Sequence, residues 1–519
     1  MDLLEVVLFL LLLSVALGWV ARRLNFPYPI ALVVGGAALG FLPEVPEFPF
    51  DPKFILVLVL PPVLYQTALL TSWRDFKANI RPIGLLAVGL VIATTLAVGA
   101  ALKFVVPDIP WAAAFVLGAI VSPPDAVAAT AILTRLNVPR RVVTILEGES
   151  LVNDASGLVL YKFAVAAVLT GTFSLRDASI EFVGVAIAGV LIGIVVGRVF
   201  IYVHRHLRDV FIEVLMTFAV PYIAYILAES LHVSGVLAVV AAGLVRGRYA
   251  PEIVSAEMRI IARSVWKLFV FLLNSLVFIL IGLQLSGILG RLSGYSPGDL
   301  MLYATLVSAV AIAVRFAWIY PATYLPRMVS ARLRERDPAQ SEQELFIMSW
   351  CGMRGIVSLA AALALPLALE GGAPFPGRDL IVFLTFVVIA VTLVVQGLTV
   401  GPLIRVLGVG TDWSEHEEEQ HARFALGKAA IAAISELEAK EGIAPELAER
   451  IRAEFAEKIS IAPPGGQILT GGADVAKRVR QAAIRAGRRE LIRIWRENRI
   501  SDDVLHHLEE DLDYQESRL

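Results

Sequence analysis

Long apolar runs constrain the fold of this chain more than any other feature of its sequence. Runs of about 17–25 residues recur from Leu3 to about Leu407, and each can cross the ~30 Å hydrocarbon core of a bilayer. Hydrophobic residues make up 57% of the chain, more than is typical of soluble domains. Because backbone polar groups must be satisfied internally in lipid, we predict an all-α polytopic membrane protein.

We predict about 13 transmembrane helices, at 3–21, 28–42, 53–71, 82–106, 111–134, 142–170, 179–203, 211–229, 233–249, 265–287, 298–326, 342–370 and 378–405. The first run ends at Arg22 and Arg23 without a small-residue cleavage site, so we expect a retained span rather than a signal peptide. Loops after odd-numbered spans are rich in Arg and Lys, and loops after even-numbered spans are not. The positive-inside rule then places the N-terminus outside and the C-terminus in the cytoplasm of a cell (inner) membrane. An odd count also fits two inverted six-helix repeats joined by the seventh span.

The composition changes after the membrane domain, which we place at residues 1–410. Residues 411–519 are hydrophilic, and we predict a cytoplasmic tail with amphipathic helices at 412–441, 445–459, 474–497 and 502–512. A solvated helical bundle is the simplest interpretation, while regulation or binding to the membrane surface, the transport domain or another tail stays open. The single cysteine, Cys351, excludes an intrachain disulfide and a cysteine-rich metal site. We expect no cofactor and no nucleic-acid partner.

Two adjacent prolines interrupt the fifth span in the segment AIVSPPDAVAAT. Pro123 and Pro124 remove two backbone donors and clash with the preceding turn, so we predict a discontinuous helix. Non-helical backbone at this depth is tolerated where it is buried in protein or lines a cavity. Asp125 lies at the break and Ser122 precedes it, which suits coordination of a cation by side chains and freed carbonyls. The alternative is a proline kink in which Asp125 caps the second half-helix.

The sixth span carries unusual polarity in the segment LEGESLVNDASG. Glu149 and Asn153 are four residues apart, as are Ser150 and Asp154, so each pair shares a helix face. We therefore expect Asn153 to hydrogen-bond Glu149 and Ser150 to lie near Asp154. Oxygen ligands without His or Cys suit a hard alkali cation. Structural polar contacts between helices are the alternative.

A buried carboxylate can bind either a proton or a cation, so the two compete for one site. We predict Na+, or K+, at Asp154, Ser150 and Asp125. Competition of this kind, coupled to alternating access, exchanges one ion for the other.

Three basic side chains also lie in apolar runs. Lys162 is either a counter-charge for Asp154 or the partner of an acid elsewhere, and we interpret Arg315 as an ion-pair partner. Arg354 stands between two glycines that permit close helix approach or unwinding. Its span corresponds to the fifth span in repeat order, so we expect Arg354 to neutralise half-helix dipole ends or to pair with a core acid.

Four segments in order, SPPDAVAATAIL, LEGESLVNDASGLVLY, GMRGIVSLAAALALP and VVQGLTVGPLIRVLGV, resemble the sodium/proton exchanger branch of the monovalent cation:proton antiporters. That branch includes bacterial NhaP-type antiporters and animal and plant Na+/H+ exchangers. The resemblance implies a homodimer in which a mobile six-helix core moves like an elevator against a dimerisation part.

The resemblance also implies roles for the polar residues. Asp154 would carry the cation and the proton, Glu149 and Ser150 would be ligands or supports, and Asn153 would stabilise Glu149. Electrogenic relatives have a second Asp where Asn153 stands. One carboxylate implies one proton per cation and electroneutral exchange, which the membrane potential would not drive.

Two positions depart from the family pattern. Many relatives have Thr where Pro124 stands, so Ser122 or a backbone carbonyl would have to coordinate the ion instead. Many carry an acid at the position of Gln66, which leaves the partner of Arg354 open. We predict a secondary antiporter, not an enzyme, that exchanges Na+, K+ or Li+ for H+ and has lipid and a second copy as partners. The alternative is a sodium-coupled solute symporter or a cation channel on a similar scaffold.

Overall fold

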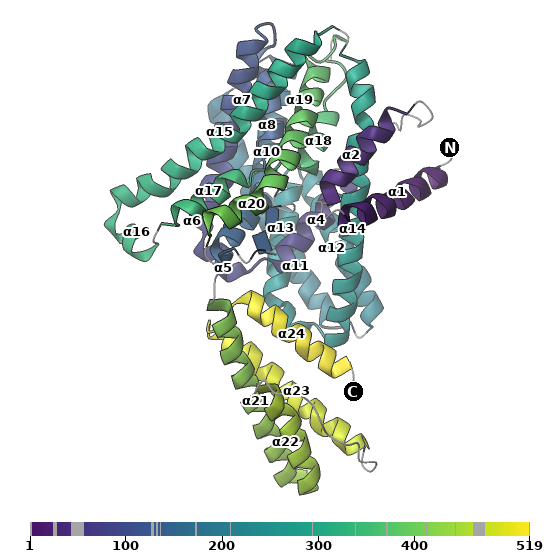
Figure 1. Ribbon diagram of the computed structural model, residues 1–519, viewed down its shortest axis with the longest axis vertical. Coiled ribbons are helices and arrows are strands. Elements are labelled where there is room, and N and C mark those ends of the chain that lie inside the picture. Colours follow the sequence, from purple (N-terminus) through teal and green to yellow (C-terminus); the bar gives the residue numbers. More distant parts are fainter. Residues whose placement is uncertain are drawn as a thin grey trace. The chain divides into compact units, whose positions relative to one another are not determined.

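The computed structural model describes the chain except for residues 1–2, 24–27, 43–56, 126–128, 131–132, 135, 137, 172–173, 208, 293, 338, 370–371, 410–413, 442, 460–472 and 518–519. Within the described residues every regular element is a helix, and one isolated β-bridge joins Ala368 to Pro374 (Figure 1). The predicted all-α class is therefore confirmed.

The helices that precede the tail include two short π-helical segments, η1 and η2. In chain order they are α1 (Leu3–Arg23), α2 (Tyr28–Gly40), α4 (Leu60–Leu70), α5 (Trp73–Ala78), α6 (Ile80–Gly84), η1 (Leu85–Leu90), α7 (Val91–Val105), α8 (Trp111–Val121), α10 (Arg140–Thr170), α11 (Leu175–His204), α12 (Val210–Ser230), α13 (Gly235–Ile253), α14 (Ala256–Gly290), α15 (Pro297–Val329), α16 (Ala331–Arg336), α17 (Glu342–Trp350), α18 (Ile356–Leu363), α19 (Arg378–Val391), η2 (Thr392–Gln396) and α20 (Gly397–Leu407).

Seven helical stretches among the described residues are long and apolar enough to cross a membrane: Ile80–Val105, Arg140–Thr170, Ile180–His204, Val210–Ser230, Ala256–Gly290, Pro297–Val329 and Arg378–Leu407. Shorter apolar helices lie at Leu8–Ala21, Tyr28–Gly40 and Trp111–Val121. Parts of the predicted third and fifth spans, 53–56, 126–128 and 131–132, lie outside the described residues. The chain is thus a multi-spanning membrane protein, and the count of 13 spans stays a prediction.

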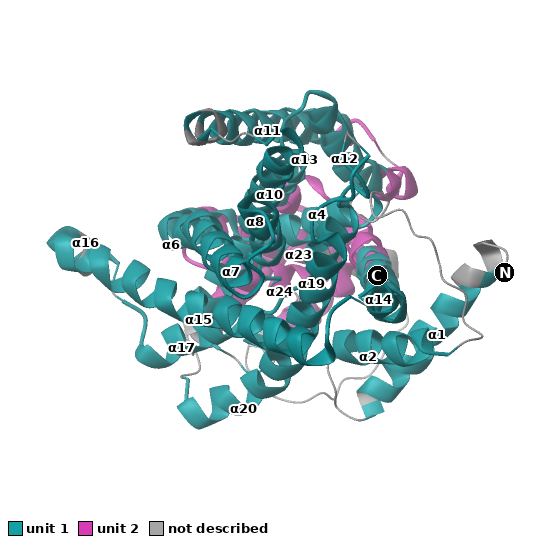
Figure 2. Ribbon diagram, turned by 90° about the horizontal axis from the view of Figure 1, so that it is seen from above, with its two compact units in different colours: residues 1–203, 216–248, 266–411 teal, residues 204–215, 249–265, 412–519 magenta. Residues whose placement is uncertain are grey.

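The chain divides into two compact units, coloured separately in Figure 2. The first contains residues 1–203, 216–248 and 266–411. The second contains residues 204–215, 249–265 and 412–519, so it combines the tail with two short segments from the membrane part of the sequence.

In the first unit, α8 lies against α7, α10, α18 and α19. The approach to α7 is close enough to require glycine, because a Cβ atom on Gly118 would lie 2.2 Å from the carbonyl oxygen of Thr95. Buried apolar side chains such as Leu117 and Ile120 fill the surrounding core. This packing fixes the end of α8, where the predicted break begins.

In the second unit, the tail consists of α21 (Ser414–Glu441), α22 (Pro445–Ile459), α23 (Ala473–Arg496) and α24 (Asp502–Ser517). These match the four predicted tail helices, although the last is longer than expected. Their apolar faces share a core that includes Ile434, Ile451, Leu491 and Leu508. The amphipathic pattern in the tail thus builds a helical bundle.

Candidate functional site

The predicted break in the fifth span is present. α8 ends at Val121, and residues 122–125 that follow are not helical. Ser122 is fully buried, and its hydroxyl donates to the carbonyl of Ala119 at 2.9 Å. The two prolines explain this ending, since neither can donate the backbone hydrogen bond that would continue the helix.

A second break lies in the twelfth predicted span. α17 ends at Trp350 and α18 starts at Ile356, so residues 351–355 connect two half-helices. Gly352 lies where the chain passes a neighbouring side chain, because a Cβ there would be 2.8 Å from Cδ of Arg315. The glycines in GMRG therefore permit the close approach that the sequence indicated.

The two breaks cross each other. The backbone N–H of Asp125 donates to the carbonyl of Met353 at 2.7 Å, which ties one broken segment to the other. Gly355 lies directly beside the side chain of Asp125, because a Cβ on Gly355 would be 1.9 Å from Oδ2 of Asp125. The carboxylate of Asp125 is thus held at the crossing of two non-helical segments.

Arg354 lies at the end of a half-helix, as its position in the sequence predicted. It is 1% exposed, and its Nη1 donates to the carbonyl of Ser122, the C-cap residue of α8. A cation there offsets the negative end of the α8 dipole. Its backbone N–H donates to the hydroxyl of Thr392 in η2 at 3.0 Å, while Gln66 is not among its hydrogen-bond partners in the described structure. The sequence had not singled out Thr392.

α10 packs directly against the first break. The amide nitrogen of Asn153 donates to the carbonyl of Pro124 at 3.0 Å. One turn later, a Cβ on Gly157 would lie 3.0 Å from Cγ of Pro123, so glycine allows the helix to approach the prolines. Asp154 stands between these two contacts and is 7% exposed. It forms no ion pair with a basic side chain in the part of the chain that the structure describes.

Glu149 has a strong partner that local sequence spacing did not identify. Both of its carboxylate oxygens accept from Arg315 on α15, with Nη2 at 2.7 Å. Nε of Arg315 donates to the carbonyl of Met348 at 3.0 Å, and both members of the pair are 1% exposed. The interpretation of Arg315 as an ion-pair residue is confirmed.

The hydrogen bond expected between Asn153 and Glu149 is not formed. A guanidinium offers two parallel charge-assisted hydrogen bonds, which are stronger than a neutral amide donor can supply. Asn153 instead donates to Pro124, and its Oδ1 has no hydrogen-bond partner among the described residues. Asn153 therefore braces the break rather than the acid.

Ser150 lies near Asp154, whereas Lys162 pairs with an acid outside the site. Ser150 lies on α10 one turn before Asp154 and is half-buried. Lys162 pairs with Glu229 at 3.1 Å, so of its two predicted roles the structure favours pairing with an acid elsewhere. Within the described residues no cluster of three or more His, Cys, Asp or Glu side chains is arranged to hold a metal ion.

Comparison with known proteins agrees with this architecture. The family model for the transmembrane sodium/hydrogen exchanger matches residues 8–406. The uncharacterized Na(+)/H(+) exchanger YjcE of Escherichia coli (strain K12) is 35% identical over 545 residues, which cover 99% of this chain and 98% of that protein. A sodium, potassium, lithium and rubidium/H(+) antiporter of Bacillus subtilis (strain 168) is 34% identical over 406 residues, which cover 76% of this chain and 60% of that one.

A solved structure shares the fold. The sodium proton antiporter MjNhaP1 from Methanocaldococcus jannaschii, determined at pH 8, aligns with a TM-score of 0.64 at 19% identity. The alignment covers 78% of this chain and 98% of that one. The family match over most of the sequence, together with the crossed broken helices, shows that this chain belongs to the sodium/hydrogen exchanger family of membrane transporters.

Proposed function

We propose that this protein exchanges a monovalent cation for H+ across the cell membrane, with Asp154 as the shared site of both ions. The observation that carries the proposal is a buried carboxylate without an ion pair among the described residues, placed beside two crossing helix breaks. An ionisable group in a membrane interior is costly and marks an ion pathway by default. A bound proton or cation neutralises the charge of Asp154 and so offsets this cost.

The charges around Asp154 support electroneutral exchange. Of the two buried acids on α10, Glu149 is balanced by Arg315, so Asp154 is the one left to change its charge during the cycle. It would bind one proton in one half of the cycle and one cation in the other. The transported charge is then equal in both directions, and the membrane potential does no net work on the cycle.

The ligands favour a hard alkali cation. Asp154, Asp125 and Ser150 supply oxygen atoms, and the hydroxyl oxygen of Ser122 keeps lone pairs for coordination although its hydrogen is donated to Ala119. With both oxygens of Glu149 engaged, this residue acts as a support. We propose Na+ as the main ion, with K+ or Li+ as further substrates, because the Bacillus subtilis relative is a sodium, potassium, lithium and rubidium/H(+) antiporter.

The wider architecture follows the same proposal. In the predicted order of 13 spans, the fifth and twelfth would stand at corresponding places in two six-helix halves, and both contain a break, which supports inverted repeats. We propose that the core around these breaks moves as an elevator in a homodimer. The distribution of Arg and Lys supports an external N-terminus and a cytoplasmic tail.

Transport in proteoliposomes tests the proposal. With an imposed pH gradient, addition of Na+ should move protons, and Li+ and K+ should be compared separately. A membrane voltage should leave the exchange rate unchanged. Voltage-dependent turnover would contradict electroneutrality, current without proton coupling would indicate a channel, and Na+ uptake that requires an organic solute would indicate a symporter.

Substitution of Gly355 by Ala should lower the exchange rate roughly tenfold or more, because the new methyl group would collide with the carboxylate of Asp125. The matched control is Gly84→Ala, where nothing lies within 4 Å of the added Cβ. Initial rates at saturating Na+ for both variants measure the effect. Equal rates for the two would show that the position of Asp125 at the crossing is not required.

A further inference from the structure

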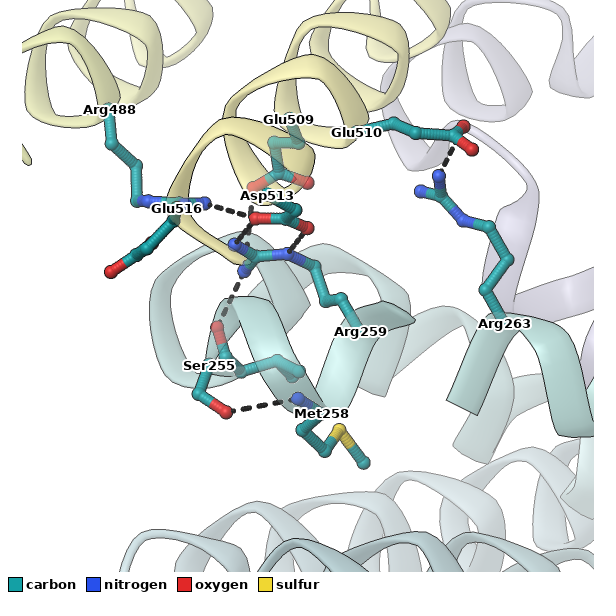
Figure 3. A network of polar contacts seen from close by, with 10 residues as sticks. Ser255, Met258, Arg259, Arg263, Arg488, Glu509, Glu510, Asp513 and Glu516 are labelled. Atoms are coloured by element: carbon teal, nitrogen blue, oxygen red, sulfur yellow. Dashed lines mark hydrogen bonds and ion pairs between the residues drawn. The ribbon is translucent and has the colours of Figure 1, made fainter. Parts of the chain in front are cut away.

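The second unit contains a buried ion pair between the tail and the start of α14 (Figure 3). Nε and Nη2 of Arg259 donate to the two carboxylate oxygens of Asp513 on α24, at 2.8 and 2.7 Å. The side chains are 10% and 1% exposed. This is the planar two-bond geometry that gives Arg–carboxylate pairs both strength and orientation.

Further contacts surround the pair. Arg488 on α23 donates to Asp513 at 2.8 Å, so this carboxylate joins two tail helices to α14. One turn after Arg259, Arg263 pairs with Glu510 on the next part of the same α24 face. Arg259 also donates to the carbonyl of Val254 at 2.5 Å, which fixes the turn between α13 and α14.

The exposure of the two ion pairs indicates which of them contributes more to the contact between α24 and α14. The Arg263–Glu510 pair is 25% and 36% exposed, and pairs of that kind contribute little to stability. The Arg259–Asp513 pair is largely buried, so removal of either partner leaves an uncompensated buried charge. Loss of one partner of the Arg259–Asp513 pair should therefore weaken the contact more than loss of one partner of the Arg263–Glu510 pair.

We propose that the acidic face of α24, formed by Glu509, Glu510, Asp513 and Glu516, is an internal docking surface for the basic start of α14, and that full transport activity depends on this docking. α14 is a single helix of 35 residues, and its part from residue 266 onward belongs to the first unit. There it packs closely on α2, since a Cβ on Gly36 would lie 2.5 Å from the carbonyl oxygen of Ile279. Docking thus holds the beginning of a helix whose remainder is part of the membrane core.

The negative charge of the α24 face favours the basic start of α14 over the membrane surface as its partner. The cytoplasmic leaflet carries anionic lipid, which repels an acidic helix face. The basic start of α14 carries the opposite charge to this face, and Arg259 donates hydrogen bonds to Asp513 on α24. The acidic surface therefore fits α14 of this chain better than a lipid surface.

Charge reversal in the full-length protein tests the proposal. Asp513→Arg and Arg259→Asp should each lower the maximal exchange rate at least threefold and leave the apparent KM for Na+ unchanged, because the ion site is untouched. In an Arg488→Ala background, which removes the second cation beside residue 513, the double change Arg259→Asp/Asp513→Arg should return to within twofold of the rate of Arg488→Ala alone. Single variants with wild-type rates, or a double variant as slow as the singles, would overturn the proposal.

Asp511→Asn is the matched control on the same helix. The carboxylate of Asp511 pairs with Arg423 on α21 at 2.7 Å, and the side chains of Asp511 and Arg423 are 37% and 39% exposed. Loss of such an exposed pair costs little, so the amide should preserve both docking and rate. If Asp511→Asn slowed exchange as much as Asp513→Arg, the effect would reflect general damage to the tail, and the docking role of the Arg259–Asp513 pair would be refuted.

A cross-link tests the docking without transport. Cysteines at Arg263 and Glu510 should be joined by a long, reducible thiol-specific cross-linker, because the extended side chains that they replace meet at their tips and Cys351, the only native cysteine, is buried. With a protease site inserted between residues 410 and 414, the cleaved tail should stay joined to the membrane fragment until a reductant is added. Release of the tail without reductant would overturn the proposal even if the protein exchanges Na+ for H+ as proposed.

Discussion

Replacement of Asp154 by Asn should abolish Na+-driven proton movement, with a fall in rate of roughly a hundredfold or more. Asn is nearly isosteric, so the packing of α10 against the break should survive. The amide can neither release a proton nor offer a negative charge to a cation, so neither half of the exchange can proceed. A fluorescent pH indicator inside proteoliposomes, with a Na+ pulse applied outside, measures the loss.

Glu147→Gln is the control for this experiment. It makes the same chemical change on the same helix, two turns before Asp154, and should exchange at close to the wild-type rate. Ligand binding adds a second measurement, because Na+ at about 100 times its Kd should stabilise the wild type by about 2.7 kcal/mol and leave Asp154→Asn unaffected. Exchange retained in Asp154→Asn would refute the assignment of the site.

Competition between protons and Na+ for one site also predicts how the apparent KM for Na+ changes with pH. If both ions use Asp154, the apparent KM for Na+ should fall as the pH rises, because fewer proteins then hold a proton at the site. The maximal rate at saturating Na+ should change less over the same range. A KM that is independent of pH would place the proton on a different residue.

The helix breaks could be predicted from the sequence because their causes are local. Pro123 and Pro124 remove two successive backbone donors, which disfavours a continuous helix, and α8 ends just before them. The glycines around Arg354 left close helix approach and local unwinding as alternatives, and the structure shows an interruption there between α17 and α18. The predicted repeat order only placed the two breaks in corresponding spans, whereas the contact between Asp125 and Met353 comes from the structure.

The partners of the charged residues could not be predicted because they lie far away in the sequence. Spacing of four residues made Asn153 the nearest candidate for Glu149, whereas Arg315 stands 166 positions away. Arg259 and Asp513 are 254 positions apart. Hydrophobic periodicity fixes which face of a helix is buried, but the pairing of two buried charges depends on how separate helices pack.

Replacement of Glu149 by Gln should lower the free energy of unfolding by about 3–5 kcal/mol, the second large effect that we expect. The change leaves the guanidinium of Arg315 buried at 1% exposure without a negative partner. Water cannot compensate a charge at such a position, so the cost is far larger than that of losing an exposed ion pair. Thermal unfolding of the purified protein in detergent measures it.

The double variant Glu149→Leu/Arg315→Met separates charge compensation from a direct role in ion binding. Replacing both members of a buried pair with apolar side chains of similar size removes the unpaired charge, so much of the lost stability should return. Recovery should be incomplete, because the carbonyl of Met348 loses the hydrogen bond from Arg315, which costs about 1–3 kcal/mol. If Glu149 only supports the fold, the double variant should still show Na+-dependent stabilisation through Asp154. Loss of that stabilisation in a well-folded double variant would instead make Glu149 a ligand of the transported cation.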